Sequence, residues 1–161
     1  MDVLAYLDRL KINYTIIEHL PVYSLNQANI IDQIDQQMII KNLFLCDDKR
    51  NNYYLVLLKN DKKLNLKRLQ KSLQSRRLTF ASEQELKTYL GVYSGAVSPL
   101  GIINDQQKLV TVVIDNDLKL IDKVAVHPNI NTKSLILAFD DLLKLIKTNG
   151  NQYCFIELKD N

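Results

Sequence analysis

Lys41 lies in the middle of an apolar segment, residues 38–45, that has the composition of a buried strand. An ammonium group taken out of water costs several kcal/mol unless an anionic group receives it. Alternation along a strand places Lys41 on one face with Ile39, Leu43 and Leu45. Two interpretations are open. The side chain reaches solvent at the strand end, or it is a preplaced cation for a phosphate or carboxylate of a ligand.

A second candidate site is the segment 95–101, Gly-Ala-Val-Ser-Pro-Leu-Gly. Its two glycines and one proline predict a tight, ordered loop, because glycine permits close backbone approach and proline fixes the turn. Such a loop can direct backbone N–H groups at a carbonyl oxygen of a ligand. A plain connection between strands is the alternative. Ser98 has no neighbouring base in the sequence, so we do not expect it to act as a nucleophile.

A third cluster, residues 127–132, groups polar side chains at the end of an expected strand: His-Pro-Asn-Ile-Asn-Thr. Pro128 stops the strand, and His127 and Asn129 offer donors and acceptors beside it. His127 either faces a ligand or is a structural residue with its own hydrogen bonds. His19 stands in a similar context just before Pro21, where it either orients the loop or faces solvent.

Several familiar kinds of catalytic site are absent from the sequence. It contains no glycine-rich phosphate motif of the usual kinds, no HExxH, no CxxC and no GxSxG elbow. With two histidines and two distant cysteines, Cys46 and Cys154, we expect neither a metal nor a cofactor. The cysteines indicate buried apolar fillers in a reducing, cytoplasmic setting. An enzyme of this sequence would depend on positioning, backbone donors and the substrate's own groups.

Basic residues are concentrated in one part of the chain. The 161 residues are 47% hydrophobic and 24% charged, as in soluble globular domains, with no apolar run long enough to span a bilayer. The net charge is +3, yet residues 59–77 alone carry +7 and the remainder −4. This distribution is typical of a protein that binds a polyanion; a solvated helix face is the alternative. The candidate contacts are Lys59, Lys62, Lys63, Lys67, Arg68 and Lys71.

The elements that position these residues can be read from periodicity and caps. Helices are predicted near residues 3–11, 24–31, 66–73, 82–91 and 140–149. Ser82 with Glu85 forms a capping-box pattern. Strands are predicted at 14–19, 38–45, 53–59, 79–81, 109–115, 123–127, 134–138 and 153–158, with the second and third joined as a hairpin. Because the elements do not alternate as βαβ units, we expect a single α+β domain with a central mixed, largely antiparallel sheet flanked by helices.

Four motifs, in this order and spacing, resemble the YbaK/prolyl-tRNA synthetase-associated editing domain family. They are residues 18–24 (Glu-His-Leu-Pro-Val-Tyr-Ser), 41–45 (Lys-Asn-Leu-Phe-Leu), 95–99 (Gly-Ala-Val-Ser-Pro, the family's GxxxP) and 126–129 (Val-His-Pro-Asn). The resemblance covers residues 1–161 as one editing domain. It is nearest to the free-standing ProX-type (PrdX) deacylases, which hydrolyse Ala-tRNA(Pro). It implies an α+β fold with a pocket for the aminoacylated 3′ end of a tRNA.

The resemblance also implies roles for individual residues. Lys41 would engage the phosphate or ribose of the terminal adenosine, while the backbone from Gly95 and Ala96 to Pro99 would hold the aminoacyl carbonyl. Hydrolysis would be substrate-assisted and independent of metal, with the terminal ribose hydroxyl helping to activate water. The implied partner is tRNA, with tRNA(Pro) first, and docking on prolyl-tRNA synthetase stays open; neither DNA nor a membrane is expected. Further substrate contacts would come from Ser24, Ser98, His127 and Asn129.

The preferred amino acid is less well defined than the reaction. Ser24 stands where the family often has threonine, and Cys46 where a basic residue is common. A pocket that admits alanine and excludes proline should be small and apolar, because missing methylenes are worth only about 1–3 kcal/mol each to the synthetic site. The alternatives are a deacylase for another mischarged tRNA, such as Cys-tRNA(Pro), and a non-catalytic module that binds tRNA or amino acids. Strand parity and loop position suggest a pocket lined by Ile39, Leu43, Val97 and Ile130.

Overall fold

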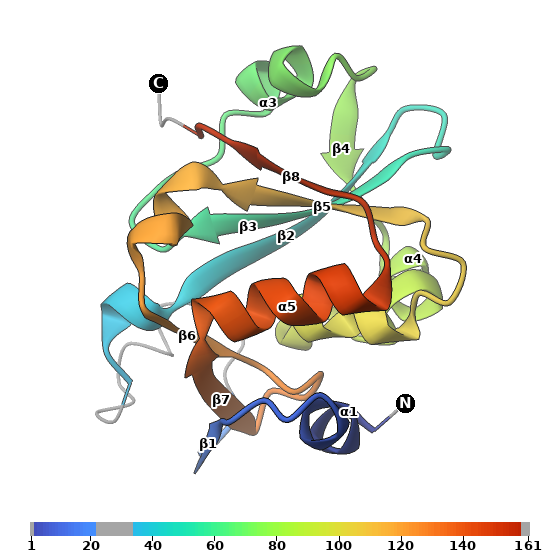
Figure 1. Cartoon of the computed structure of the whole chain (residues 1–161). Coiled ribbons are helices and arrows are strands. Elements are labelled where there is room, and N and C mark those ends of the chain that lie inside the picture. The colour runs from blue at the N-terminus through green and yellow to red at the C-terminus, as the bar shows by residue number, and fades with distance from the viewer. Residues whose placement is uncertain (1, 22–33, 159–161) are drawn as a thin grey trace.

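The structure is a computed structural model that describes residues 2–21 and 34–158. Its centre is a five-stranded mixed sheet with the strand order β4-β2-β3-β5-β8 (Figure 1). β2 pairs antiparallel with β3 and β4, while β3, β5 and β8 run parallel to one another. The predicted α+β class and mixed sheet are therefore confirmed. The strand bounds are β2 Ile40–Asp47, β3 Tyr53–Lys59, β4 Leu78–Phe80, β5 Val110–Asp115 and β8 Tyr153–Ile156.

The β2–β3 hairpin forms as the two apolar runs and the polar turn between them predict. Its pairing runs from Ile40 opposite Lys59 to Cys46 opposite Tyr53. The buried carboxylate of Asp47 accepts hydrogen bonds from two residues of the turn, which closes it. Lys41 follows Ile40 and therefore lies near the open end of the hairpin, away from the turn.

Three strands form a separate antiparallel sheet in the order β1-β7-β6. These are β1 (Thr15–Glu18), β6 (Lys123–Val126) and β7 (Lys133–Ala138). The sequence predicted the central mixed sheet but did not assign these three strands to a second one, because period-two alternation defines strands but not which strands pair. A single parallel bridge between Ile39 and Ala125 joins the small sheet to the start of β2.

Helices cover both faces of the central sheet (Figure 1). α3 lies over one face, while α5 and α4 lie across the other. α4 passes directly into a π-helical turn, η2, which ends at Gly91 with φ +64°, a conformation that glycine adopts without strain. The helix predicted near 24–31 lies outside the described residues, and no described helix has the length and apolarity to cross a membrane. The helix bounds are α1 Val3–Arg9, α3 Leu66–Leu73, α4 Glu83–Glu85, η2 Leu86–Leu90 and α5 Phe139–Asn149.

Alternation along β2 divides its side chains between two apolar layers. Leu45 packs with Leu69 of α3 on one face of the sheet. Phe44 belongs to the larger cluster on the opposite face, together with Leu142 of α5 and Leu135 of the small sheet. Odd-numbered β2 residues therefore face α3, and even-numbered ones face the small sheet and α5. This division fixes where each candidate residue on the strand can point.

A polar cluster ties α4 to the hairpin. The Glu85 carboxylate accepts hydrogen bonds from the Tyr53 hydroxyl (2.5 Å) and the Ser82 N–H (2.9 Å), and it pairs with Arg50. The Ser82 hydroxyl accepts from the Glu85 N–H, so the predicted capping box is confirmed. Burial alone would raise the pKa of Glu85, but these hydrogen bonds outweigh it and hold the pKa at about 2. The carboxylate is therefore charged throughout the neutral range.

Candidate active site

Two loops that are distant in the sequence are held together by a buried serine. The first loop contains two 3-10 turns, η3 (Ser94–Ala96) and η4 (Pro99–Asn104), and Ser98 is the N-cap of the second. The fully buried Ser98 hydroxyl donates to the His127 carbonyl oxygen (2.5 Å) and accepts from the Leu100 N–H (3.1 Å). The glycine–proline loop is therefore ordered and lies against the start of the 127–132 segment. Since the Ser98 hydroxyl both donates and accepts a hydrogen bond within the protein, its role here is to fix the conformation of the loop.

A tyrosine makes a second link between the same loops. The Tyr93 hydroxyl donates to the Asn131 side-chain oxygen (2.9 Å) and accepts from the Asn131 N–H (3.2 Å). Asn131 is 4% exposed, so both of these polar groups need partners inside the protein. Sequence analysis did not single out Tyr93; an aromatic residue at the start of a loop is too common to signal this contact. Together the two links make the loops one structural unit.

His127 lies on this unit with one ring nitrogen committed. Its Nδ1 is 3.0 Å from the Lys133 carbonyl oxygen, which can only accept, so Nδ1 carries the proton. Burial lowers the pKa of His127, and nearby His19 lowers it further, although the Lys133 carbonyl acts in the opposite direction. The ring is therefore neutral at pH 7, with Nε2 as an acceptor. A neutral imidazole of this kind can accept a proton or a hydrogen bond from a ligand hydroxyl.

His19 supports the same region from the small sheet. Its Nδ1 donates to the Leu20 carbonyl oxygen (2.7 Å), and its Nε2 accepts from the Ser134 hydroxyl (2.9 Å). The two imidazole ring centres are 6.2 Å apart. Both ring nitrogens of His19 are thus hydrogen-bonded within the protein. This favours a role in orienting the loop over exposure to solvent, the two interpretations that the sequence left open.

Lys41 and its neighbour point to opposite faces of β2. Lys41 lies on the face of α3, where its ammonium group donates to the Lys62 carbonyl oxygen. Asn42 lies on the face of the small sheet and α5, the side on which Val97 packs. The bridge from Ile39 to Ala125 is parallel, so β2 and the chain entering the 127–132 segment leave it in the same direction. The start of β2 therefore lies beside the loop unit, with Asn42 on its side of the strand.

Asn42 is a candidate residue that sequence analysis quoted within a motif without assigning it a role. Its side-chain N–H reaches the Ile40 carbonyl oxygen at 3.4 Å, while its buried Oδ1 has no hydrogen-bond partner in the part of the chain that the structure describes. An unpaired buried amide oxygen costs free energy unless a ligand supplies a donor. The sequence did contain a signal, an amide side chain inside an apolar strand, but the adjacent Lys41 was the more unusual residue and received the functional assignment.

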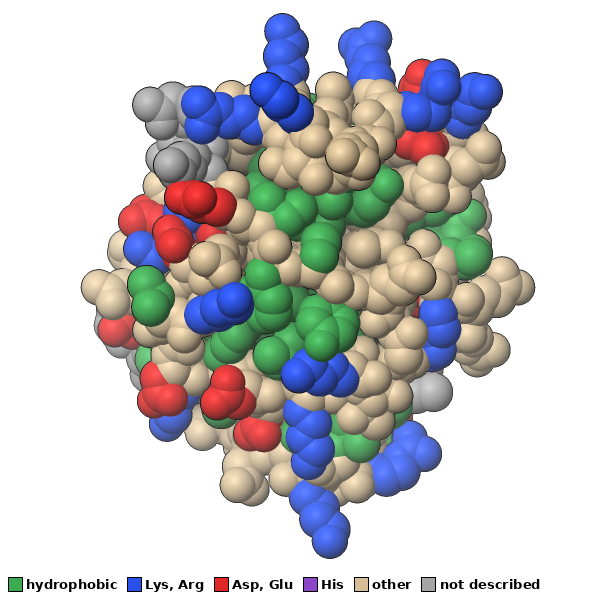
Figure 2. Space-filling model, turned by 45° about the horizontal axis from the view of Figure 1, so that its top comes forward, with side chains coloured by type: hydrophobic (Ala, Val, Ile, Leu, Met, Phe, Trp, Pro, Cys, Tyr) green, Lys and Arg blue, Asp and Glu red, His purple; other side chains and the backbone are tan. Residues whose placement is uncertain are grey.

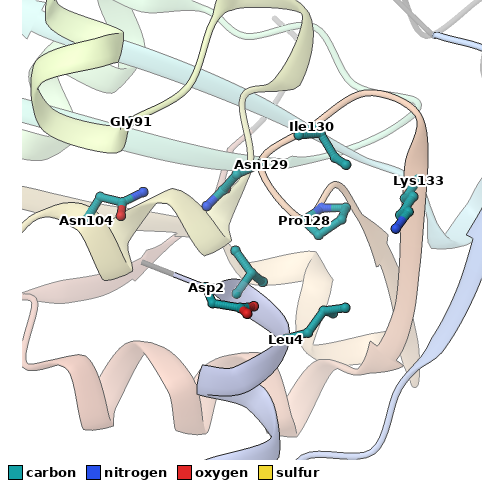
Figure 3. Close-up of a pocket in the computed structure, with 9 residues that line it drawn as sticks. Asp2, Leu4, Gly91, Asn104, Pro128, Asn129, Ile130 and Lys133 are labelled. Carbon is teal, nitrogen blue, oxygen red and sulfur yellow. The ribbon is translucent and has the colours of Figure 1, made fainter.

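Asn129 carries the other buried side-chain oxygen without a partner among the described residues. Its backbone has φ +65°, a conformation that asparagine tolerates better than most residues. Asn129 lines an open cavity of about 480 Å³ together with Pro128 and Ile130 of its own loop and residues of α1, as Figure 3 shows. Neither Lys41 nor the glycine–proline loop contributes to this cavity. The structure therefore places Asn129 within the loop unit, on the side that borders α1.

The structure does not assemble the apolar pocket suggested from strand parity. Leu43 packs in the layer beneath α3, Ile39 packs with Ala125, and Val97 packs in the opposite layer. Ile130 is 40% exposed. This expectation is corrected because Leu43 faces α3, whereas Ile39 precedes β2 and packs against the small sheet. Ser24 lies outside the described residues.

Most of the predicted basic segment projects from one end of the molecule. Lys67, Arg68 and Lys71 are exposed on α3, whose buried face is formed by Leu69. Figure 2 shows Lys and Arg side chains extending around the end of the molecule where α3 lies. Lys63 is also exposed, and Lys59 pairs with an acidic neighbour at 3.3 Å. Since Lys41 points to the α3 face, its ammonium lies on the same side of the sheet as this basic helix.

Lys62 differs from the rest of the segment. Its ammonium contacts Asp115 Oδ1 (2.9 Å), Asp117 Oδ2 (2.8 Å) and the Leu158 carbonyl oxygen (2.7 Å), and its side chain is 14% exposed. Burial lowers the pKa of Lys62, but the two carboxylates outweigh it and raise the pKa overall. The expectation that Lys62 is an exposed tRNA contact is therefore corrected, because its charge is already neutralised within the protein.

Comparison with known proteins places the chain in a family. The family model for the aminoacyl-tRNA editing domain matches residues 19–145. Prolyl-tRNA editing protein ProX of Acetoanaerobium sticklandii is 48% identical over 156 residues, which are 97% of this chain and 95% of that protein. Prolyl-tRNA synthetase associated domain-containing protein 1 of Mus musculus is 31% identical over 157 residues, covering 90% of this chain and 88% of the relative.

A solved structure supports the fold independently. It is described as a candidate trans-editing enzyme for prolyl tRNA synthetase and superposes with a TM-score of 0.77 at 20% identity, covering 99% of this chain and 96% of the other. At that identity the likeness concerns the fold alone. The family match over residues 19–145 and the 48% identity over nearly the full length of both chains show family membership as well. This chain belongs to the aminoacyl-tRNA editing domain family.

Proposed function

We propose that this protein is a trans-editing deacylase that hydrolyses the ester bond of mischarged Ala-tRNA(Pro). Family membership supports hydrolysis of an aminoacyl-tRNA, and the 48% identity to a prolyl-tRNA editing protein supports tRNA(Pro). The single observation that carries the proposal is the loop unit, in which the Ser98 hydroxyl fixes the glycine–proline loop against His127. This unit sets backbone donors and a neutral imidazole beside one end of β2.

In the proposed reaction, the ester carbonyl binds to backbone N–H groups of the loop from Gly95 to Pro99 other than that of Ala96, which donates to the Tyr93 carbonyl oxygen; Pro99 has no N–H and fixes the turn. A water molecule attacks the carbonyl carbon, the bond to the terminal ribose oxygen breaks, and that oxygen takes a proton. The neighbouring ribose hydroxyl helps to activate the water, because the Ser98 hydroxyl is committed to the His127 carbonyl oxygen and the Ser134 hydroxyl, although it donates to His19 Nε2, is buried within β7. His127 Nε2 accepts a hydrogen bond from the ribose or the water, and alanine and free tRNA leave.

Two β2 residues bind the substrate from opposite faces of the strand. The Oδ1 of Asn42, which has no partner among residues 2–21 and 34–158, accepts a hydrogen bond from the substrate, for which the α-ammonium group of the aminoacyl ester is a suitable donor. Lys41, on the α3 face, binds a phosphate or the ribose of the terminal adenosine. Lys41 is thus a binding and orienting residue, and it takes no part in proton transfer.

The reaction is tested with a panel of purified aminoacyl-tRNAs. We expect rapid hydrolysis of Ala-tRNA(Pro), slow hydrolysis of Cys-tRNA(Pro) and protection of Pro-tRNA(Pro), measured as loss of acid-precipitable radiolabelled amino acid. Preference for Cys-tRNA(Pro) would identify a deacylase of different specificity. Tight tRNA binding with no turnover of any member would contradict the proposal and favour a non-catalytic binding module.

The tRNA body is proposed to bind the basic helix α3. We expect Lys67→Glu with Lys71→Glu to weaken tRNA binding and to lower the slope of log K against log salt by about 2, because each lysine contributes about one phosphate contact. Binding is measured by fluorescence anisotropy from 50 to 200 mM salt, concentrations over which phosphate contacts have large effects.

The control for this charge change lies on the other face of the sheet. Lys144 and Lys147 are exposed on α5, and reversing both changes the net charge by the same amount. We expect the control to keep the wild-type salt slope. If the two double variants gave equal salt slopes, the lysines of α3 would be part of a solvated helix face and not a binding site for tRNA.

We further propose that residues 1–161 form one editing domain. The family model begins at residue 19 and ends at 145, yet Val3 and Leu7 before it and Ile146 and Phe155 after it pack in the same apolar cluster. The proposed partner is tRNA(Pro), and docking on prolyl-tRNA synthetase is compatible with this arrangement.

A further inference from the structure

Lys62 makes contacts through both its backbone and its side chain. Its carbonyl oxygen accepts a hydrogen bond from the Lys41 ammonium. Its own ammonium lies between Asp115 Oδ1 at 2.9 Å, Asp117 Oδ2 at 2.8 Å and the Leu158 carbonyl oxygen at 2.7 Å. Asp115 is fully buried at the end of β5. One residue therefore connects Lys41 to the buried Asp115 at the end of β5, to the partly exposed Asp117 just after it, and to the chain following β8.

The turn that carries Lys62 is fixed at several further points. The Lys62 N–H donates to the Lys59 carbonyl oxygen (3.0 Å), and the Lys59 N–H donates to Asp115 Oδ2 (3.0 Å). The Asn60 side chain donates to the Gln36 carbonyl oxygen (3.2 Å), which attaches the turn to the segment just before β2. The start of β2, which carries Lys41, and the turn after β3, which carries its acceptor, are thus joined in one hydrogen-bond network.

We propose that Lys62 is a positioning residue for Lys41 in the deacylation reaction. The Lys62 ammonium, clamped by Asp115 and Asp117, fixes the turn, and the turn fixes the carbonyl oxygen that receives one of the three Lys41 N–H donors. Two donors of Lys41 then remain for the substrate in a defined direction. The inference rests on the proposed function, because it assigns Lys62 to the orientation of a substrate-binding cation.

Removal of the Lys62 ammonium has a predictable structural effect. Asp115 would keep its buried charge without a counter-ion, and the turn would lose its attachment to the ends of β5 and β8. Lys41 would keep its charge but lose its fixed acceptor. Small displacements of a positioning group lower catalytic rates strongly, by as much as about 100-fold for a shift of about 1 Å. The loss should therefore appear in the chemical step.

The test is a double-mutant cycle of Lys62→Met and Lys41→Met under single-turnover conditions with Ala-tRNA(Pro). We expect Lys62→Met to lower the maximal deacylation rate about tenfold, with half-saturation within about twofold of wild type because the exposed basic helix is intact. Lys62→Arg, which keeps a cation, should recover part of the rate. In the Lys41→Met background, Lys62→Met should change the rate by less than about twofold, since the group that it positions is gone.

A second measurement does not depend on activity. The Lys41 ammonium should give a slowly exchanging ¹⁵Nζ signal in the wild-type protein, assigned by its loss in Lys41→Met, and Lys62→Met should abolish it. If Lys62→Met does not fold, Asp117→Asn replaces it, because Asp117 is the more exposed partner, at 46%, and its loss leaves Asp115 in place. We then expect an approximately threefold loss of rate and a broadened Lys41 signal.

Three results would overturn the inference. The first is a wild-type deacylation rate in Lys62→Met, and the second is an equal loss of rate from Lys62→Met in the wild-type and Lys41→Met backgrounds. The third is a change in the tRNA concentration at half-saturation with no change in the maximal rate. Lys49→Met, an exposed lysine at the opposite end of the hairpin, is the matched control and should keep the wild-type rate. Failure of the proposed function is distinguishable, because the wild-type protein would then be inactive on the whole panel of aminoacyl-tRNAs.

Discussion

Lys41→Ala should lower kcat/KM for Ala-tRNA(Pro) by about 30- to 150-fold, which corresponds to about 2–3 kcal/mol of lost charge-assisted binding. The expected size follows from the location of Lys41 on a partly buried strand face, where a hydrogen bond to phosphate is stronger than in water. Because the residue binds and orients the tRNA end, both kcat and KM should change. Steady-state deacylation over a range of tRNA concentrations measures the two separately.

Two variants give this result its controls. Lys41→Arg keeps the charge but replaces a compact ammonium with a wide planar fork, so we expect it to recover only part of the activity. Lys49→Ala removes an exposed lysine from the hairpin turn and should leave kcat/KM unchanged. Wild-type kinetics in Lys41→Ala, with the fold intact by circular dichroism, would show that the strand lysine has no part in substrate binding.

Glu85→Ala should lower the free energy of unfolding by about 2–4 kcal/mol, a large fraction of the stability of an ordinary domain. The Glu85 side chain is 13% exposed and satisfies Arg50, the Ser82 N–H and the hydroxyl of the buried Tyr53. Its loss removes the acceptor of the buried Tyr53 hydroxyl, the capping-box contact of Ser82 and the ion pair with Arg50. Urea unfolding at pH 7 measures the change, and Glu83→Ala, on the exposed side of the same first turn, is the matched control with an expected change below about 0.5 kcal/mol.

The contribution of Glu85 should depend on pH in a defined direction. Its pKa is about 2 in the folded protein against a reference of 4.5, so its charge stabilises the fold fully above about pH 4.5. That stabilisation is lost as the pH falls from about 4.5 towards 2. The difference in unfolding free energy between wild type and Glu85→Gln should therefore shrink over this window. A difference that stays constant from pH 6 to pH 3 would show that the carboxylate is not specifically stabilised.

Sequence reasoning succeeded where the determining contacts are local. The β2–β3 hairpin and the Ser82–Glu85 capping box depend on neighbouring residues, and the structure confirms both. The fold class followed from the order of the elements, but the division into two sheets did not, because pairing partners are distant in the sequence. The region near 24–31, which includes Ser24, lies outside the described residues.

The candidate site shows the same limit at the level of single side chains. Lys62 resembled its basic neighbours in sequence, and only the fold brings it to Asp115, Asp117 and Leu158. The Ser98 contact with His127 likewise joins two loops far apart in the chain. Alternation alone placed Leu43 in the substrate pocket, whereas the fold covers that face with α3. Side-chain type can therefore suggest chemistry, but tertiary contacts decide which groups remain available for a ligand.

A chain still being made on the ribosome cannot contain this site. The bridge that sets the start of β2 beside the small sheet joins Ile39 to Ala125, and β1 has β7, residues Lys133–Ala138, as its sheet partner. Strand β1 therefore stays unpaired until most of the protein has been synthesised, with an open edge that can pair with other chains. A product that ends before residue 125 has the lysine strand, the basic helix and the glycine–proline loop, but it lacks His127, against which Ser98 fixes that loop.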